Sequence, residues 1–416
     1  MIEGFQHRPC RKYQASASLL LMQLDLEIRI TRFLKERNRG LFNALPGRPE
    51  EPDKEFLEQY TIYAIAEKGR YKTAWAKKGG SKQMSAIKEK NAYLSICYHY
   101  IRSRENSRRF PRILGNTVNE FRGHIRMIKE NYETVSLDDA YRFSYEDFSF
   151  NGEKYGMLIT FDDGLSDHYL AAEILAEYGI KGVFFISTCA LKDNLPLNPT
   201  IIHYCLAVYG IKNFLDVYRK ALEENKIDIM RHEVDFKKGD NPQKAIYEIK
   251  EIFKYKLGKN ASRNVLLYIY RNSLLRDYPN ALELMYLTRK QIKDMLQMGH
   301  FIGVHTHSHI SVGASDLSQE DFAKEMIEPK RYLEEAFDTS IIAFSYPFGE
   351  NKDCLSAERL ISRTNEYQLA FTVEKNLNMK DTSPLRLGRY QLASTDSDRS
   401  LKNALNAIIE GKGNSI

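Results

Sequence analysis

Two carboxylates stand side by side where an apolar run of the chain ends. Asp162, Asp163 and Gly164 follow residues 157–161, a run typical of a buried strand in an α/β protein. Successive side chains of an extended segment point to opposite sides of the backbone, so one acid could bind a metal ion while the other moves a proton. The alternative is an ordinary Asp-Gly turn after a strand, which these residues alone do not exclude.

A second polar cluster also follows an apolar run. His305, His307 and His309 lie within five positions of a chain that has 10 histidines in 416 residues. Neutral imidazoles beside a carboxylate are typical ligands of catalytic zinc, and three protein ligands leave a position open for water. A polar strand end with solvated histidines is the alternative. The combination of two acids with several imidazoles favours a catalytic metal site.

The two clusters carry a resemblance to a known family. Residues 160–164 (TFDDG) followed by residues 305–309 (HTHSH) resemble the polysaccharide deacetylase family, also called carbohydrate esterase family 4 or the NodB-homology domain. Residues 344–349 (FSYPFG) stand where the third family motif belongs, and the resemblance extends over about residues 93–392. The resemblance implies a distorted (β/α)7 barrel and a metal-dependent hydrolase that removes an N-acetyl or N-formyl group from an amino sugar.

The resemblance also implies a metal site and a base. Asp163, His305 and His309 would hold the metal, and Asp162 would take a proton from the attacking water. His307 would face away from the metal or support its ligands. Zinc is the metal expected from these ligand types, although two imidazoles and a carboxylate also accept cobalt, nickel or iron.

The general acid and the oxyanion donor come from other segments. One branch of the family has an early Tyr-His segment whose histidine protonates the leaving amine, and His99 matches it. No histidine follows His309, so the late motif of the other branch is absent. A satisfied core histidine at a strand end is the alternative for His99. The resemblance implies that the backbone N–H of Phe348 stabilises the oxyanion.

The third motif departs from the family at one position. Ser345 stands where the family has an arginine that pairs with the base carboxylate. Arg386 and Arg389, on the last predicted strand, could replace that arginine; Arg389 is our candidate, and the sequence does not decide between the two. A solvent-facing basic pair is the alternative.

The order of the predicted elements agrees with a parallel α/β barrel. Predicted strands alternate with helices, and such barrels place their chemistry at the carboxyl ends of the strands. Residues 91–416 would form the catalytic domain, with a helical insertion at about 190–287 that could cap the site. Residues 1–90 would be a helical, basic extension, with helices at 15–35 and 54–68. The seven strands are predicted to begin at Leu94, Met157, Val183, Phe301, Ile341, Gln368 and Leu385.

Composition limits the class of protein and its setting. Hydrophobic residues make up 43% and charged residues 28% of the chain, and the net charge of +6 does not indicate a nucleic-acid binder. Five scattered cysteines without a CxxC pair fit a reducing cytoplasm. No run is long enough for a membrane helix, and residues 18–22 lack the features of a signal peptide. The basic residues of 66–90 could touch a membrane surface, or could be a solvated linker.

These observations predict a cytoplasmic deacetylase that acts on a glycan or on a lipid- or nucleotide-linked precursor of a surface polysaccharide. An amidase for a small non-sugar molecule is one alternative. A catalytically impaired glycan-binding protein is another, favoured by Ser345 and by the missing late histidine. The intact acid and histidine clusters argue against it, because binding alone needs no base beside a metal site.

Overall fold

The structure is a computed structural model that describes residues 60–67, 70–77, 90–237, 239–315 and 317–413. The chain divides into two compact units, Met1–Ile87 and Lys88–Ile416. The first unit is described only by two strands, and the second contains all the predicted site residues. In the part of the chain that is described, no helix has the length and apolar character needed to cross a membrane.

The described part of the first unit is an antiparallel pair of strands. β1 (Tyr60–Glu67) pairs with β2 (Arg70–Lys77), from Tyr60 opposite Lys77 to Glu67 opposite Arg70. The helix predicted over residues 54–68 is therefore wrong for Tyr60–Glu67, and β2 occupies part of the predicted basic connector. The physical reason is that β1 is rich in aromatic and β-branched residues, which favour a strand over a helix. The helix predicted at 15–35 lies outside the described residues.

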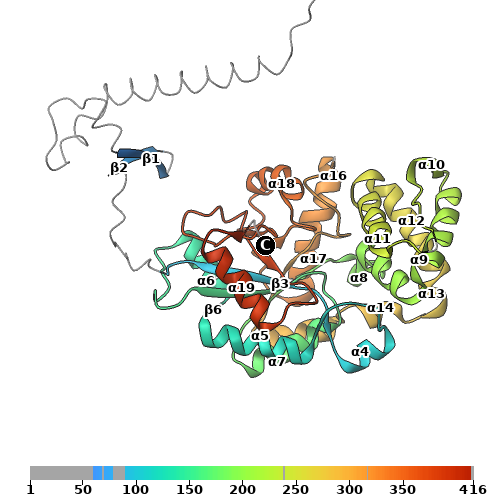
Figure 1. Cartoon of the computed structure of the whole chain (residues 1–416), viewed down its shortest axis with the longest axis horizontal. Coiled ribbons are helices and arrows are strands. Elements are labelled where there is room, and N and C mark those ends of the chain that lie inside the picture. Colours follow the sequence, from blue (N-terminus) through green and yellow to red (C-terminus); the bar gives the residue numbers. More distant parts are fainter. Residues whose placement is uncertain (1–59, 68–69, 78–89, 238, 316, 414–416) are drawn as a thin grey trace, which may run out of the picture. The chain divides into compact units, whose positions relative to one another are not determined.

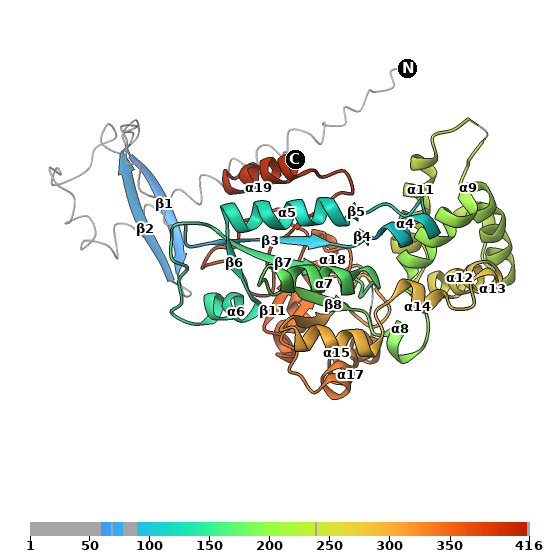
Figure 2. The same ribbon diagram turned by 90° about the horizontal axis from the view of Figure 1, so that it is seen from below.

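A parallel sheet forms the centre of the second unit (Figures 1 and 2). Seven strands follow one another across the sheet, and an eighth, β6 (Glu133–Val135), pairs with β7 beside them. Every pairing within this sheet is parallel, as alternation of strands and helices predicts. In spatial order the seven are β11 (Leu369–Phe371), β10 (Ala343–Ser345), β9 (Phe301–Val304), β8 (Val183–Ile186), β7 (Gly156–Phe161), β3 (Tyr93–Tyr98) and β12 (Tyr390–Gln391).

The sheet curls into a distorted barrel, because the segment before β12 returns to the opposite edge. The Leu387 N–H donates to the Ala370 carbonyl at 2.8 Å, and the Thr372 N–H donates to the Leu387 carbonyl at 2.8 Å. The same segment then continues into β12, which pairs with β3. The two edges are thus joined through one short stretch, which confirms the predicted distorted (β/α)7 barrel.

Helices pack around the barrel. α5 shows why they form: Thr117 and Glu120 make a capping box at its start, and Phe121, Ile125 and Ile128 lie buried on one face. Small elements complete this part: β4 (Ile101–Arg102), α4 (Arg104–Arg109), β5 (Asn116–Thr117), α16 (Gln319–Phe322) and η2 (Ala323–Ile327). The surrounding helices are α5 (Val118–Asn131), α6 (Leu137–Tyr145), α7 (Asp167–Glu177), α15 (Arg289–Gln297), α17 (Glu328–Phe337), α18 (Asn351–Thr364) and α19 (Asp398–Ile409).

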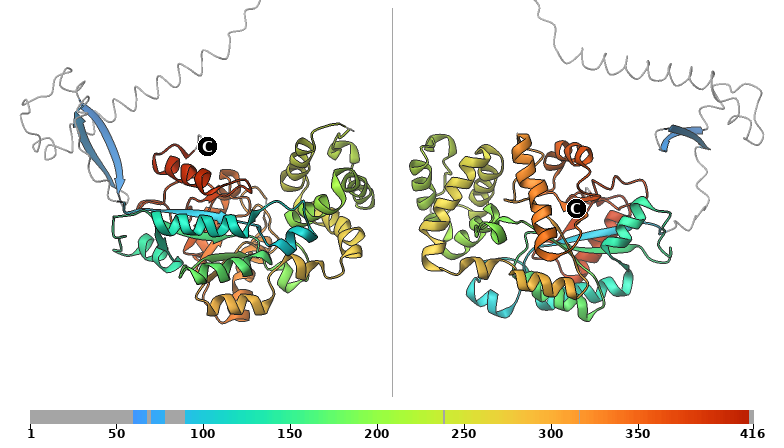
Figure 3. Two further views of the ribbon diagram at one scale, coloured as in Figure 1. Left: turned by 60° about the horizontal axis from the view of Figure 1, so that its bottom comes forward. Right: turned by 180° about the vertical axis from the view of Figure 1, so that it is seen from behind.

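The long stretch between β8 and α15 is helical and has a hydrophobic core of its own. Figures 2 and 3 show its helices gathered to one side of the barrel, beyond the carboxyl end of β3. The long helix α9 bends at Gly210, whose φ of 77° is outside the helical range. The elements are α8 (Cys189–Lys192), α9 (Asn198–Glu224), α10 (Ile229–His232), α11 (Pro242–Glu251), η1 (Ile252–Lys256), α12 (Lys259–Asn272), α13 (Leu274–Asp277) and α14 (Ala281–Met285).

Candidate active site

The two adjacent acids lie where β7 ends. Asp162 and Asp163 follow Phe161, the last residue of β7, and both side chains are buried. The Asp162 N–H donates to the Tyr98 carbonyl at 3.1 Å, which extends the pairing of β3 with β7 by one residue. Asp163 then turns the chain with a φ of 83°. The two carboxylates have different partners: Asp163 faces two histidines and Asp162 faces an arginine.

Asp163, His305 and His309 come together as a buried group. Asp163 Oδ1 lies 3.2 Å from His309 Nε2 and 3.5 Å from His305 Nε2. His305 Nδ1 lies 2.8 Å from the Ser345 carbonyl, which can only accept, so this nitrogen carries the proton. Burial lowers the pKa of His305 to about 4, against the opposing charge of Asp162, so the imidazole is neutral near pH 7. Its Nε2 lone pair is therefore available on the side of Asp163.

These three residues fit a divalent cation. Asp163 Oδ1 is buried, has no hydrogen-bond partner, and faces two imidazole nitrogens. Burial favours the neutral acid, but His309, His99 and His305 outweigh it and hold the pKa of Asp163 well below its usual range. A buried carboxylate oxygen without a hydrogen-bond partner is costly unless a cation lies beside it. One carboxylate and two imidazoles form the ligand set of catalytic zinc sites.

The backbone of the site is strained. In the described part of the chain, eight residues other than glycine have positive φ, and four of them belong here: Asp163 at 83°, Thr306 at 59°, His309 at 60° and Phe348 at 64°. Such conformations cost about 1–3 kcal/mol each for ordinary side chains and concentrate at functional sites. The Thr306 hydroxyl accepts a hydrogen bond from the His309 N–H at 2.9 Å and so supports this turn.

Asp162 is held by Arg389. Two parallel hydrogen bonds join them, Nη1 to Oδ1 and Nη2 to Oδ2, each 2.8 Å long. The guanidinium is fully buried and also donates to the Thr372 carbonyl, the Thr160 hydroxyl and the Ser345 hydroxyl. Arg389 therefore occupies the place beside Asp162 that the sequence analysis assigned to it.

Arg386 points elsewhere, since it donates to Glu374 and Asn351.

The charge of Arg389 decides the protonation of Asp162. Burial alone would raise the pKa of Asp162, but the guanidinium, its hydrogen bonds and the nearby histidines outweigh burial and hold the pKa well below its usual range. Asp162 is thus ionised throughout the neutral and mildly acidic range.

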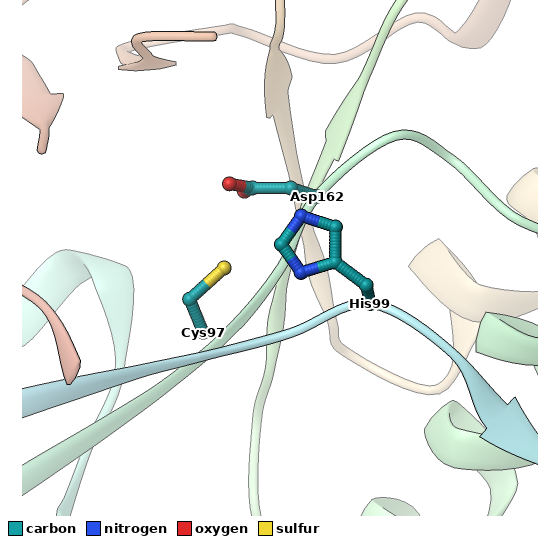
Figure 4. Close-up of side chains that lie close together, drawn as sticks. All are labelled: Cys97, His99 and Asp162. Atoms are coloured by element: carbon teal, nitrogen blue, oxygen red, sulfur yellow. The ribbon is translucent and has the colours of Figure 1, made fainter. Parts of the chain in front are cut away.

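His99 follows β3 and lies beside Asp162 and Cys97 (Figure 4). The potential ligand atoms of these three residues lie within 4.8 Å of one another. A second metal ion is disfavoured there, because the Arg389 guanidinium already binds both Asp162 oxygens and would repel a cation. Burial raises the pKa of the Cys97 thiol well above its usual range, so it is a neutral neighbour. This arrangement leaves His99 free to act as an acid.

The remaining predicted residues also have definite places. The Phe348 ring packs edge-on against His309, with centroids 4.9 Å apart, and its N–H has no hydrogen-bond acceptor among the described residues. His307 faces away from Asp163: its ring nitrogens lie 2.9 Å from the Thr188 hydroxyl and 2.8 Å from Asp193. The N–H of Phe348 thus remains available to a ligand.

Three neighbours of the site have no role in the sequence-based prediction, although His168, close after the two acids, could be expected to line the site. His168 donates from Nε2 to the His99 carbonyl at 2.8 Å, and Cys97 lies beside His99. His203, from α9 in the helical insertion, lies 3.2 Å from the Tyr100 hydroxyl. No motif marks these residues, although Cys97 stands directly before the Tyr98-His99 pair.

Comparisons with known proteins give one family match. A family model described as "Polysaccharide deacetylase" matches residues 151–363. Similar solved structures include the deacetylase PplD from Streptococcus pyogenes in complex with acetate (18% identity, 75% of this chain and 97% of that chain, TM-score 0.44). IcaB from Ammonifex degensii is another (17% identity, 75% and 96%, TM-score 0.42). A comparison with curated proteins gives no match.

Proposed function

The chain belongs to the polysaccharide deacetylase family, and we propose that it is a metal-dependent hydrolase that removes an N-acetyl group from an amino sugar. The observation that supports this most directly is the pairing of Asp162 with Arg389 next to the group Asp163, His305 and His309. A protein that only binds glycans needs neither an ionised base nor a buried, unpaired carboxylate beside it. The non-catalytic alternative is therefore disfavoured.

Asp163, His305 and His309 would hold the metal, and zinc is the ion that best suits a carboxylate with two imidazoles. When bound, a divalent cation polarises an amide carbonyl and lowers the pKa of water from about 16 toward about 7. The His305–Ser345 hydrogen bond fixes the ring orientation needed for a ligand. The strained turns at Asp163 and His309 aim their side chains toward the same point.

Two neighbouring side chains would move the protons of the reaction. Asp162, kept ionised by Arg389, would take the proton from the attacking water. His99, beside Asp162, would give a proton to the nitrogen as the C–N bond breaks, so that a neutral amine leaves instead of an amide anion. The N–H of Phe348 would donate to the oxygen that gains negative charge. Acetate and the free amino sugar are the products.

The test measures metal content and acetate release on the full chain. We expect about one equivalent of a transition metal in the parent protein and none in His305→Ala, because three ligands hold one ion. The metal-loaded parent should release acetate from the N-acetylglucosamine tetramer and from N-acetylglucosamine 1-phosphate. Metal-loaded protein that releases acetate from neither would overturn the proposal and favour glycan binding. The cytoplasmic setting and the membrane contact of residues 66–90 stay predictions.

A further inference from the structure

A lysine of the helical insertion reaches the third motif. Lys254 lies in η1, a single π-helical turn, and its Nζ is 4.3 Å from the centroid of the Phe348 ring. The same ring packs against His309, one of the candidate metal ligands, at 4.9 Å between centroids. Phe348 therefore separates a positive charge from the candidate metal site by one aromatic ring. Isolated π-helical turns are frequent at functional sites.

A second lysine lies one turn earlier on the same face. Lys250 lies in the last turn of α11, and burial followed by the charge of Lys254 lowers the pKa of Lys250. Burial and the charge of Lys250 lower the pKa of His203 to about 3. The charges of Asp163 and His309 also shift this pKa. Lys250, Lys254 and His203 therefore lie on the side of the site formed by the insertion.

The positive charge of these lysines is not neutralised within the protein. In the described residues, neither Lys250 nor Lys254 has a carboxylate within 4.0 Å, although both side chains are half-buried. Burial lowers the pKa of both ammonium groups, which is the cost of placing them there without a counter-ion. Lys352 shows the contrast, because it lies 3.5 Å from Glu350.

Two of the three acids that act on the charge of Lys254 already have other partners. Glu350, Asp353 and Glu251 act on its charge from beyond ion-pair distance. Glu350 contacts Lys352, and Asp353 accepts hydrogen bonds from the Tyr255 hydroxyl and the Glu350 N–H. Since none of the three acids lies within ion-pair distance of Lys254, an anion from outside the protein could pair with Lys250 and Lys254.

We propose that Lys254, with Lys250, forms a subsite for a phosphate attached to the amino sugar that is deacetylated. This inference rests on the proposed function and specifies its substrate class. In a 2-acetamido sugar 1-phosphate, the phosphate stands on the carbon next to the one that carries the amide. A phosphate held by the lysines therefore presents the amide on the Phe348 side, where His309 lies.

Phosphate fits the two lysines better than a carboxylate. Lysine acts as a mobile point charge, and two of them neutralise the charge of a phosphate, whereas planar carboxylates are bound most specifically by arginine. Both side chains that lack a carboxylate partner here, Lys250 and Lys254, are lysines. Sugar 1-phosphates, nucleotide-linked sugars and lipid-linked sugars all carry such a phosphate.

The test compares phosphorylated and neutral substrates in matched variants of the metal-loaded full chain. We measure kcat/KM for N-acetylglucosamine 1-phosphate and for the neutral N-acetylglucosamine tetramer, and take the ratio. A charge-assisted contact is worth about tenfold or more in affinity, so the parent ratio should fall about tenfold in Lys254→Gln and further when Lys250→Gln is added. Lys256→Gln, exposed on the same turn, is the control and should keep the parent ratio.

Each outcome decides one question. A parent that cleaves both substrates equally well, or a Lys254→Gln variant that keeps the parent ratio, overturns the phosphate subsite while the deacetylase function stands. N-acetylmuramic acid carries a carboxylate in place of a phosphate, and a preference for it over the phosphorylated sugar also overturns the phosphate subsite. If no probe is cleaved, the proposed function fails; calorimetric binding of N-acetylglucosamine 1-phosphate that is lost in Lys254→Gln then supports the subsite, and absent binding overturns it. UDP-N-acetylglucosamine and a polyprenyl-diphosphate-linked sugar, compared in the same way, identify the source of the phosphate.

Discussion

Arg389 binds both carboxylate oxygens of Asp162, at 2.8 Å each, although the two residues stand 227 positions apart in the chain. Ser345 lies between them: its hydroxyl donates to Asp162 at 3.1 Å and accepts from Arg389 at 2.8 Å. A serine at this position leaves room for the arginine that directly precedes β12. The base carboxylate therefore has a guanidinium partner even though the third motif lacks its arginine.

Replacing Arg389 by lysine should impair catalysis without removing the charge. A lysine cannot form two parallel hydrogen bonds to a carboxylate, so Asp162 would lose its fixed orientation and part of its charge stabilisation. We expect kcat to fall at least about tenfold and the acidic limb of the pH–rate profile to move to higher pH, because the pKa of Asp162 rises when the guanidinium is lost. Rate measurements from pH 4 to pH 8 check both effects.

Arg386→Lys is the matched control, because Arg386 is paired with Glu374 and not with Asp162. An Arg389→Lys variant with lower kcat but an unmoved acidic limb would mean that Arg389 supports the fold and does not set the pKa of Asp162. Removing the charge altogether, as in Arg389→Met, would leave a buried carboxylate unpaired, which typically costs about 3–5 kcal/mol of stability.

Asp162→Asn should separate the base from the metal site. Asparagine has nearly the same shape but cannot accept a proton at neutral pH, so we expect kcat to fall about 10²–10⁴-fold, the usual contribution of a general base. Metal content should stay at the parent value, since Asp163, His305 and His309 are unchanged. Elemental analysis and acetate release on the same preparation measure the two effects, with Asp163→Asn as the variant that should lose metal. Full activity in Asp162→Asn would show that the base is another residue.

How far the sequence predicts the site depends on how local each signal is. Asp162 and Asp163 are adjacent, and His305 and His309 are four residues apart, so short motifs reveal them. The barrel follows from strands that alternate with helices. The pairing of Arg389 with Asp162 needed the resemblance, which indicated that an arginine was missing, and the closure of the barrel then decided between Arg386 and Arg389.

Other features could not be predicted, because nothing in the local pattern fixes them. The sequence predicts a helix where β1 lies, since the two alanines and the isoleucine at Ala64, Ile65 and Ala66 fit a helix as well as a strand. The approach of Lys254 to Phe348 depends on how the insertion folds over the strand ends, which is a tertiary contact without a sequence signal.

His99→Gln should affect substrates according to their leaving group. An amine must be protonated as it leaves, so acetate release from an N-acetylated sugar should fall about 10²–10⁴-fold without a general acid. 4-Nitrophenolate leaves without a proton, so hydrolysis of 4-nitrophenyl acetate should fall less than about tenfold if His99 contributes only as the acid. Asp162→Asn should lose both activities, because both need activated water. An equal loss of both activities in His99→Gln would contradict the role of His99 as general acid.

His168 should make the protein less stable as the pH falls. Its ring is fully buried against Phe161 and Phe184, and burial lowers its pKa to about 4, against the opposing hydrogen bond to the His99 carbonyl. Above an unfolded-state pKa of about 6.5, the ring is neutral in both states and the full stability is present. As the pH falls from about 6.5 to about 4, the unfolded chain binds a proton that the folded protein does not bind, so the free energy of unfolding decreases by up to about 1.4 kcal/mol per pH unit.

His168→Gln keeps an N–H for the His99 carbonyl but does not titrate, so urea unfolding at pH 7.0, 5.5 and 4.5 should show a shallower decline in the free energy of unfolding than in the parent. The same decline in both proteins would mean that His168 is not the group that binds this proton.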